Sequence, residues 1–270
     1  MIGPWDMLAL LAVLLFGLPH GAADASLAMQ TRYGENPTRL ASFMLGYLSL
    51  AALMVAVWWL APIVALSGFL LMTIYHFGRG DALAYGRTQL HLRALLHGGF
   101  ILTVALSNEP QVTALFFLLT GSDVWPVLVM LRALWLCWLM GLGFALLTDR
   151  VSLKALGEII GLFFVALIGS PLIAFAIYFC LVHSARHFAR LAADPSLNTT
   201  RHRNQAALLA GISILAVLVG AAFLNPTQWG DGLMQSLFIA LAALTVPHML
   251  LVDGFDLIKT EETRTKHAAA

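Results

Sequence analysis

The sequence predicts an all-α, polytopic transmembrane helical bundle with about nine crossings. Sixty per cent of the 270 residues are hydrophobic and 11% are charged, whereas soluble domains carry about 25% charged residues. Apolar runs such as 40–60, 125–147 and 206–223 reach the ~20 residues that a helix needs to cross a bilayer. These runs must be helical, because backbone groups in hydrocarbon have to be satisfied within the segment.

The expected crossings follow one another without a linker or a change of composition, so residues 1–270 are predicted to form a single integral membrane domain. The Gly169-Ser170-Pro171 break fits a boundary between two crossings or a proline kink in one long helix. Segment 111–120 is too short to span comfortably and is expected to be re-entrant or an extra short helix. We place the crossings near residues 7–26, 40–60, 62–77, 88–107, 125–147, 155–169, 171–191, 206–223 and 233–253.

Basic residues gather in alternate connections, which predicts the orientation. The connections at 61–62, 108–111, 169–171 and 224–232 contain no Lys or Arg. The other connections and the chain end contain Arg32, Arg39, Arg79, Arg87, Arg93, Arg150, Lys154, Arg186, Arg190, Arg201, Arg203, Lys259, Arg264 and Lys266. The positive-inside rule then puts the amino terminus outside and the carboxyl terminus in the cytoplasm, in the plasma (inner) membrane. A formal net charge of +1 gives no reason to expect a nucleic acid partner.

Seven of the nine histidines lie in or at the edge of expected helices, each toward the basic end: His20, His76, His91, His97, His183, His187 and His248. Polar groups in transmembrane segments are costly and are by default functional candidates. His183 and His187, in HSARH, are four residues apart and share one helix face, so both can reach one metal ion. Hydrogen bonding between helices is the alternative for each histidine. A shared metal would satisfy several imidazoles at once, and an all-imidazole site suits iron, copper, zinc or nickel.

A carboxylate follows three of these histidines at short spacing. Asp24 lies four residues after His20 in PHGAAD, and Asp81 lies five after His76 in YHFGRGD. The PHMLLVD segment places Asp253 five residues after its histidine. Carboxylates near ligating imidazoles commonly fix their tautomer, so we expect Asp24 and Asp81 to orient the histidines that precede them. The alternative is that they face headgroups and water at helix ends.

The segments GLPHGAAD, YHFGRGD and HSARH, in this order on a polytopic chain, closely resemble the Brp/Blh family of membrane β-carotene 15,15'-dioxygenases. The resemblance runs from the first helix to the last. It implies a non-haem Fe(II) enzyme that uses dioxygen to cleave the central double bond of β-carotene, giving two molecules of retinal. The iron ligands that it implies are His20, His76, His183 and His187. His97, in LHGG, and His248 also resemble family positions and are expected beside the ligands or in the pocket.

Four aromatic side chains near the expected ligands could line an apolar slot for the polyene: Tyr75, Phe77, Tyr178 and Phe179. Their rings could face positive charge that develops on the substrate, although ordinary helix packing is the simpler explanation for each. β-Carotene dissolves in the bilayer core, so an embedded enzyme can receive it laterally without passing it through water.

Two other classes of function stay open at this point. One is another membrane metalloenzyme, of the hydroxylase or desaturase type or with haem. Di-iron hydroxylases and desaturases carry several HxxxH and HxxHH boxes, whereas this chain has one HxxxH pair. The other is a non-enzymatic retinoid-binding protein or small-molecule transporter. An opsin needs a lysine within a helix for its Schiff base, and Lys154, Lys259 and Lys266 all lie at helix ends or in the tail.

Overall fold

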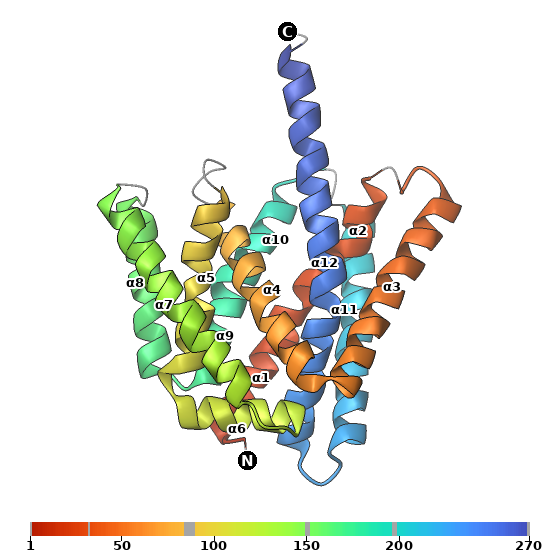
Figure 1. Ribbon diagram of the computed structural model, residues 1–270. Helices are drawn as coiled ribbons and strands as arrows, with labels where there is room; N and C mark the ends of the chain where they lie inside the picture. The colour runs from red at the N-terminus through yellow and green to blue at the C-terminus, as the bar shows by residue number, and fades with distance from the viewer. Residues whose placement is uncertain (1, 32, 84–89, 149–151, 196–198, 269–270) are drawn as a thin grey trace.

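The computed structural model describes residues 2–31, 33–83, 90–148, 152–195 and 199–268, with side chains up to Val252. Over these ranges the chain is almost entirely helical and contains no strand. The helices form one bundle, with the two termini at opposite ends (Figure 1). Arg32, Arg87 and Arg150 lie outside the described residues, as do the side chains of the tail from 253 onward.

The helices follow the apolar runs of the sequence. Their bounds are α1 Pro4–Ala12, α2 Asp24–Met29, α3 Pro37–Leu60, α4 Pro62–Ala82, α5 Leu90–Ser107, α6 Glu109–Thr120, α7 Trp125–Leu147, α8 Leu153–Ile168, α9 Pro171–Tyr178, α10 Ala185–Ala192, α11 Thr200–Leu224 and α12 Trp229–Ala268. Three irregular helical turns join them: the π turns η1 Val13–Gly17 and η4 Phe179–Ser184, and the 3₁₀ turn η2 Leu18–Ala23. Because α1 to α2 and α9 to α10 are continuous through these turns, each series forms one long helical segment.

Eight of the described segments are long and apolar enough to cross a membrane. The sequence predicted about nine. They are Pro4–Met29, Pro37–Leu60, Pro62–Ala82, Leu90–Ser107, Trp125–Leu147, Pro171–Ala192, Thr200–Leu224 and Trp229–Val252. The ninth expected segment is α8, whose 16 residues extend about 24 Å, shorter than the ~30 Å hydrocarbon core. It still runs from the end of the bundle where α7 finishes to the end where α9 begins, in agreement with the opposite positions of the termini (Figure 1). The 111–120 segment belongs to a short helix, α6, which is one of the two structures expected for it.

The break before Pro171 is a helix boundary and not a kink. Gly169 is extended, and the Ser170 hydroxyl oxygen accepts a hydrogen bond from the Ile173 N–H at the start of α9. Pro171 occupies the first turn of α9, where its missing N–H has no helical partner to lose. A capping serine followed by proline therefore separates α8 from α9.

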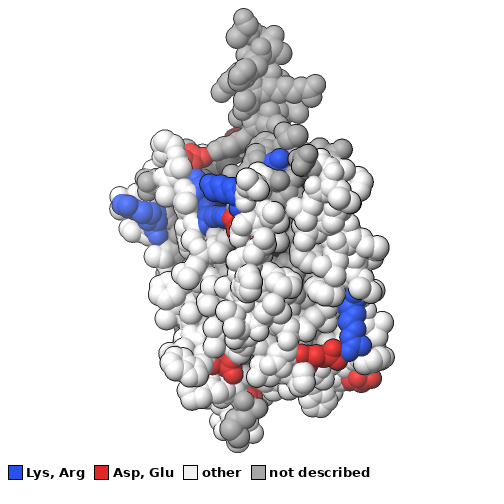
Figure 2. Space-filling model, turned by 90° about the vertical axis from the view of Figure 1, so that its left-hand side faces the viewer, with Lys and Arg blue, Asp and Glu red and all other residues white. Residues whose placement is uncertain are grey.

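The outer surface is apolar where lipid is expected to lie. Figure 2 shows one face of the molecule, on which charged side chains gather near the two ends and leave an uncharged band between them. Large side chains such as Leu60, Leu147 and Phe223 are more than 80% exposed. A surface of this kind cannot be stable in water and indicates a protein embedded in a bilayer.

Helices α4 and α5 pack at glycines, which brings their backbones into close contact. A Cβ atom on Gly78 would lie 1.8 Å from the Ala94 carbonyl oxygen, and one on Gly98 would lie 2.1 Å from the Ile74 carbonyl oxygen. Without a hydrophobic driving force between helices, such small-residue contacts are a main source of association in membranes. This contact fixes His76 and His97, which lie within two residues of the glycines, relative to each other.

We expect Gly98→Ala to destabilise the protein by about 1–3 kcal/mol, because the added methyl group must push α4 and α5 apart. The matched control is Gly46→Ala in α3, where a Cβ atom meets nothing within 4 Å and helix propensity favours Ala by up to about 1 kcal/mol. Denaturant-induced unfolding in detergent measures both. Equal stability of the two variants would contradict the close packing of α4 on α5.

Candidate metal centre

Five histidines from four parts of the chain meet inside the bundle, each between 2 and 8% exposed. The His248 ring centroid lies 5.1 Å from those of His20 and His76. The His183 ring lies 5.5 Å from that of His20 and 5.3 Å from that of His76. The His187 ring lies 5.6 Å from His20 and 5.5 Å from His248. Since metal–nitrogen bonds are about 2.0–2.1 Å long, imidazoles around one tetrahedral ion have centroids roughly 5 Å apart.

The nitrogens, as well as the rings, are close enough to share an ion. Ligand atoms of His20, His76 and His248 all lie within 4.8 Å of one another. The sequence-based ligand set contained His20 and His76 but placed His248 beside the ligands. In the structure, a ring nitrogen of His248 is close enough to those of His20 and His76 for all three to bind one ion.

Several of these imidazole nitrogens are buried without a protein partner. Within the described part of the chain, Nε2 of His76, His187 and His248 and both ring nitrogens of His183 have no hydrogen bond. Each unpaired buried polar group costs about 1–3 kcal/mol. A cation bound by the neutral rings would remove this cost, so the donor set fits a metal ion, and its lack of thiolate or carboxylate at the centre suits the metals of imidazole sites.

Irregular helical turns position His20 and His183. The π turn η1 precedes His20 and the π turn η4 contains His183, and such turns are frequent at functional sites. His20 Nδ1 donates to the Gly17 carbonyl oxygen at 2.5 Å, which leaves Nε2 free for the cluster. A Cβ atom on Gly17 would lie 2.4 Å from the Phe179 ring, so only glycine allows η1 to approach η4 this closely.

Asp24 orients a different histidine from the one expected. Its carboxylate accepts a hydrogen bond from His248 Nδ1 at 2.8 Å and another from the Tyr47 hydroxyl at 2.7 Å. The expected partner, His20, uses Nδ1 for its bond to Gly17 instead. Asp24 begins α2, beyond the turn that carries His20, and therefore faces α3 and α12. The pairing fixes Nδ1 of His248 as the protonated nitrogen and leaves its Nε2 for the centre.

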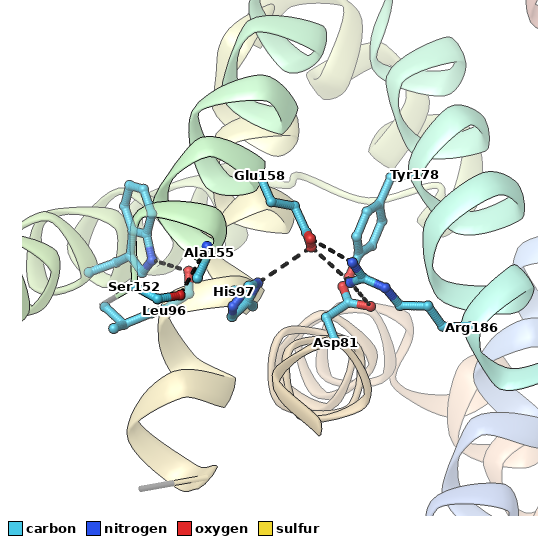
Figure 3. Close-up of polar contacts among 9 residues, drawn as sticks. Asp81, Leu96, His97, Ser152, Ala155, Glu158, Tyr178 and Arg186 are labelled. Atoms are coloured by element: carbon cyan, nitrogen blue, oxygen red, sulfur yellow. Dashed lines mark hydrogen bonds and ion pairs between the residues drawn. The ribbon is translucent and has the colours of Figure 1, made fainter. Parts of the chain in front are cut away.

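Asp81 likewise has no described bond to His76. It belongs to a polar network with Tyr178, Arg186, Glu158 and His97 (Figure 3). Its carboxylate accepts a hydrogen bond from the Tyr178 hydroxyl at 2.6 Å and lies 3.1 Å from Arg186 Nη1. Arg186 also forms two hydrogen bonds with Glu158 of α8, at 2.8 and 2.5 Å. His97 Nδ1 lies 3.7 Å from the same glutamate. His97, expected at the pocket, thus has its described contact in this network.

The network fixes the rotation of the helix that carries HSARH. Arg186 lies three residues after His183 and one before His187, so it projects from the helix face beside the histidines, and its bidentate contact with Glu158 limits how far the helix can rotate. Sequence analysis missed Arg186, Glu158 and Tyr47 as parts of the site. A signal existed for Glu158, which is the one charged residue of the expected helix 155–169.

Of the four aromatic residues expected near the ligands, Phe77 and Phe179 contact the cluster. The Phe77 ring lies 4.2 Å from that of His183, and the Phe179 ring lies 5.2 Å from that of His20. Tyr178 is fully buried and is bonded to Asp81. Tyr75 instead bonds His91 Nδ1 at 2.8 Å and stacks on that ring, because the α4 face next to His76 turns toward α5.

Comparison with known proteins identifies the family. The sequence profile named β-carotene 15,15'-dioxygenase matches residues 11–256. A β-carotene 15,15'-dioxygenase of an uncultured marine bacterium is 34% identical over 92% of this chain and 93% of its own length. A probable β-carotene 15,15'-dioxygenase Blh of Halobacterium salinarum is 28% identical over 92% of this chain and 83% of its own. No solved structure matches significantly. The chain therefore belongs to the β-carotene 15,15'-dioxygenase family of carotenoid-cleaving enzymes.

Proposed function

We propose that this protein cleaves β-carotene at its central 15,15' double bond with dioxygen, giving two molecules of retinal, at a non-haem Fe(II) centre. The observation that carries the proposal is the convergence of five buried imidazoles, several with unpaired nitrogens, in a chain of this family. Family membership decides against the transporter and the hydroxylase or desaturase alternatives.

The proposed ligands are His20, His76, His183 and His187, as the family motifs imply, and His248 is the fifth imidazole at ligand distance. Imidazole nitrogen is a suitable donor for iron in the divalent state. When bound, Fe(II) would supply the activation of dioxygen. The protein's own part is to hold the rings in one arrangement, through Asp24 at His248, Gly17 at His20 and Arg186 on the helix of His183 and His187.

The surroundings of the centre suit a hydrocarbon substrate. Phe77 and Phe179 lie against the cluster and make its surroundings apolar. Positive charge that develops on the polyene during oxidation would be stabilised by aromatic rings beside it. Water is kept away by the burial of every histidine in the cluster. We further propose that the protein lies in the plasma (inner) membrane with its carboxyl terminus in the cytoplasm, where the basic connections gather.

Cells that accumulate β-carotene test the activity directly. Expression of the protein should bleach their orange pigment and produce retinal, measured by chromatography of extracted pigment. The His183→Ala variant should leave the pigment intact at equal protein levels, because it removes one proposed ligand. His202→Ala is the matched control and should bleach normally, since this histidine lies in the first turn of α11 and has no described contact with the cluster. Persistent pigment with the unaltered protein would remove the proposed activity.

Metal content separates the ligands from the residues that orient them. In the purified protein, His20→Ala, His76→Ala, His183→Ala and His187→Ala should each abolish stoichiometric iron, measured by elemental analysis. His248→Ala should also lose iron if this ring is a ligand, and the His202→Ala control should retain it. Full iron content in His183→Ala would take this residue out of the ligand set, whatever the effect on turnover.

Replacing Asp24 by Asn tests its role in orienting His248. The amide keeps the shape but removes the charge that fixes the protonated Nδ1, so iron affinity should fall roughly 10–100-fold. Competition with a chelator measures this affinity without any turnover. The control is Asp6→Asn, since Asp6 in α1 accepts a hydrogen bond from Ser170 and has no described contact with the cluster. Unchanged affinity in Asp24→Asn would show that the carboxylate serves packing alone.

A further inference from the structure

An apolar cavity of about 70 Å³ lies between α4, α5, α6, α9 and α12, apart from the histidine cluster. Its lining is aliphatic and aromatic except for Thr73. The Thr73 hydroxyl donates a hydrogen bond to the Phe69 carbonyl oxygen at 2.6 Å, so it is turned away from the cavity toward the backbone. The cavity therefore offers a ligand no hydrogen bond from this side chain, which suits a hydrocarbon and disfavours a polar compound.

Three helices carry both a cavity residue and a histidine of the cluster, and they give the distance between the two. Phe69 precedes His76 by seven residues in α4, and Phe175 precedes His183 by eight. In α12, a third cavity residue, Phe238, precedes the cluster histidine by ten. At 1.5 Å per helical residue, these offsets place the three phenylalanines roughly 10–15 Å from the cluster along the bundle. Thr73, which also lines the cavity, precedes His76 by only three residues, so the cavity extends from near the cluster to these phenylalanines and beyond.

A row of aromatic rings joins the cavity to the cluster. Phe175, which lines the cavity, stacks on Phe179 with centroids 5.3 Å apart and planes 15° apart. Phe179 in turn stacks on the His183 ring at 5.9 Å and 13°. Phe77 lies beside this row, 5.2 Å from Phe179 and 24° from its plane. Rings stacked in this way form a continuous row of apolar edges, along which a polyene can lie.

We propose that the cavity receives one end ring of the carotenoid, and that the aromatic row guides the adjoining half of the polyene to the histidine cluster. The separation of roughly 10–15 Å between the cavity phenylalanines and the cluster is comparable with the distance from the central double bond of β-carotene to its end ring. An end ring held in the cavity would thereby place the central double bond at the histidine cluster. Phe116 and Phe238 are only half-buried at its edge and can turn to admit the ring. This inference rests on the proposed function and adds how the cleaved bond is chosen.

Filling the cavity tests the inference without turnover. Ala105 lines the cavity and is 5% exposed, so Ala105→Phe puts a ring where the end ring would lie. Iron-loaded protein is incubated with β-carotene in micelles without dioxygen, and the pigment that co-elutes on gel filtration is measured. We expect Ala105→Phe to retain roughly tenfold less pigment, since an end ring loses its apolar contacts. Ala133→Phe on the exposed face of α7 is the matched control and should retain pigment normally.

A variant that enlarges the cavity provides a second measurement. If Ala105→Phe does not fold, this second variant is sufficient to test the inference. Phe116→Ala should loosen the position of the end ring, so that unequal apocarotenal fragments appear beside retinal when dioxygen is supplied. Undiminished pigment binding by folded Ala105→Phe, or retinal as the sole product of Phe116→Ala, would overturn the inference. Failure of the proposed function is distinguishable, because it shows as no cleavage by the unaltered protein, whereas the binding measurement does not depend on cleavage.

Discussion

The cost of burying unpaired imidazole in a membrane protein is the constraint on which the rest of this structure depends. Five histidines lie where water does not reach, and among the described residues His183 has no hydrogen bond at either ring nitrogen. In hydrocarbon, the protein cannot recover this cost from solvent. A shared cation would recover it for all the rings together, and the binding of that cation would then contribute to the stability of the bundle. In the proposed site, metal binding and folding are therefore coupled.

Holding five rings around one point requires that each helix have a fixed rotation, and polar contacts between helices provide it. Arg186 binds Glu158 on one side and approaches Asp81 on the other, which fixes the helix of His183 and His187 against α8 and α4. Asp24 joins α2 to α3 and α12 through Tyr47 and His248. Removing one member of these contacts would leave its partner without the opposite charge or hydrogen bond that it has in the bundle. These contacts restrict the bundle to the arrangement in which the imidazoles converge.

Local pattern in the sequence predicted the helices and part of the site, and failed where distant segments meet. Apolar runs located the helices, and the spacing of His183 and His187 predicted that both face one centre. The pairing of carboxylates with their nearest histidines was wrong, because Asp24 meets a histidine 224 residues away and Asp81 meets Tyr178 and Arg186. Spacing reports neighbours on one helix, whereas packing between helices decides the partner of a side chain at a helix end. The predicted helix 155–169 began two residues and ended one residue too late, since α8 spans Leu153–Ile168 and Gly169 leaves the helix.

Aromatic and polar side chains of the same helix point in different directions near the cluster. In α9 and η4, Phe175 and Phe179 form the aromatic row, while Tyr178 between them in sequence turns its hydroxyl to Asp81. The helical period makes this possible, because residues one apart point in different directions while residues four apart share a face. The carboxylates of Asp81 and Glu158 both contact Arg186. A polyene bound along the proposed aromatic row would therefore reach the imidazole cluster without first contacting a charged group, as suits a substrate that has no polar group for the protein to bind.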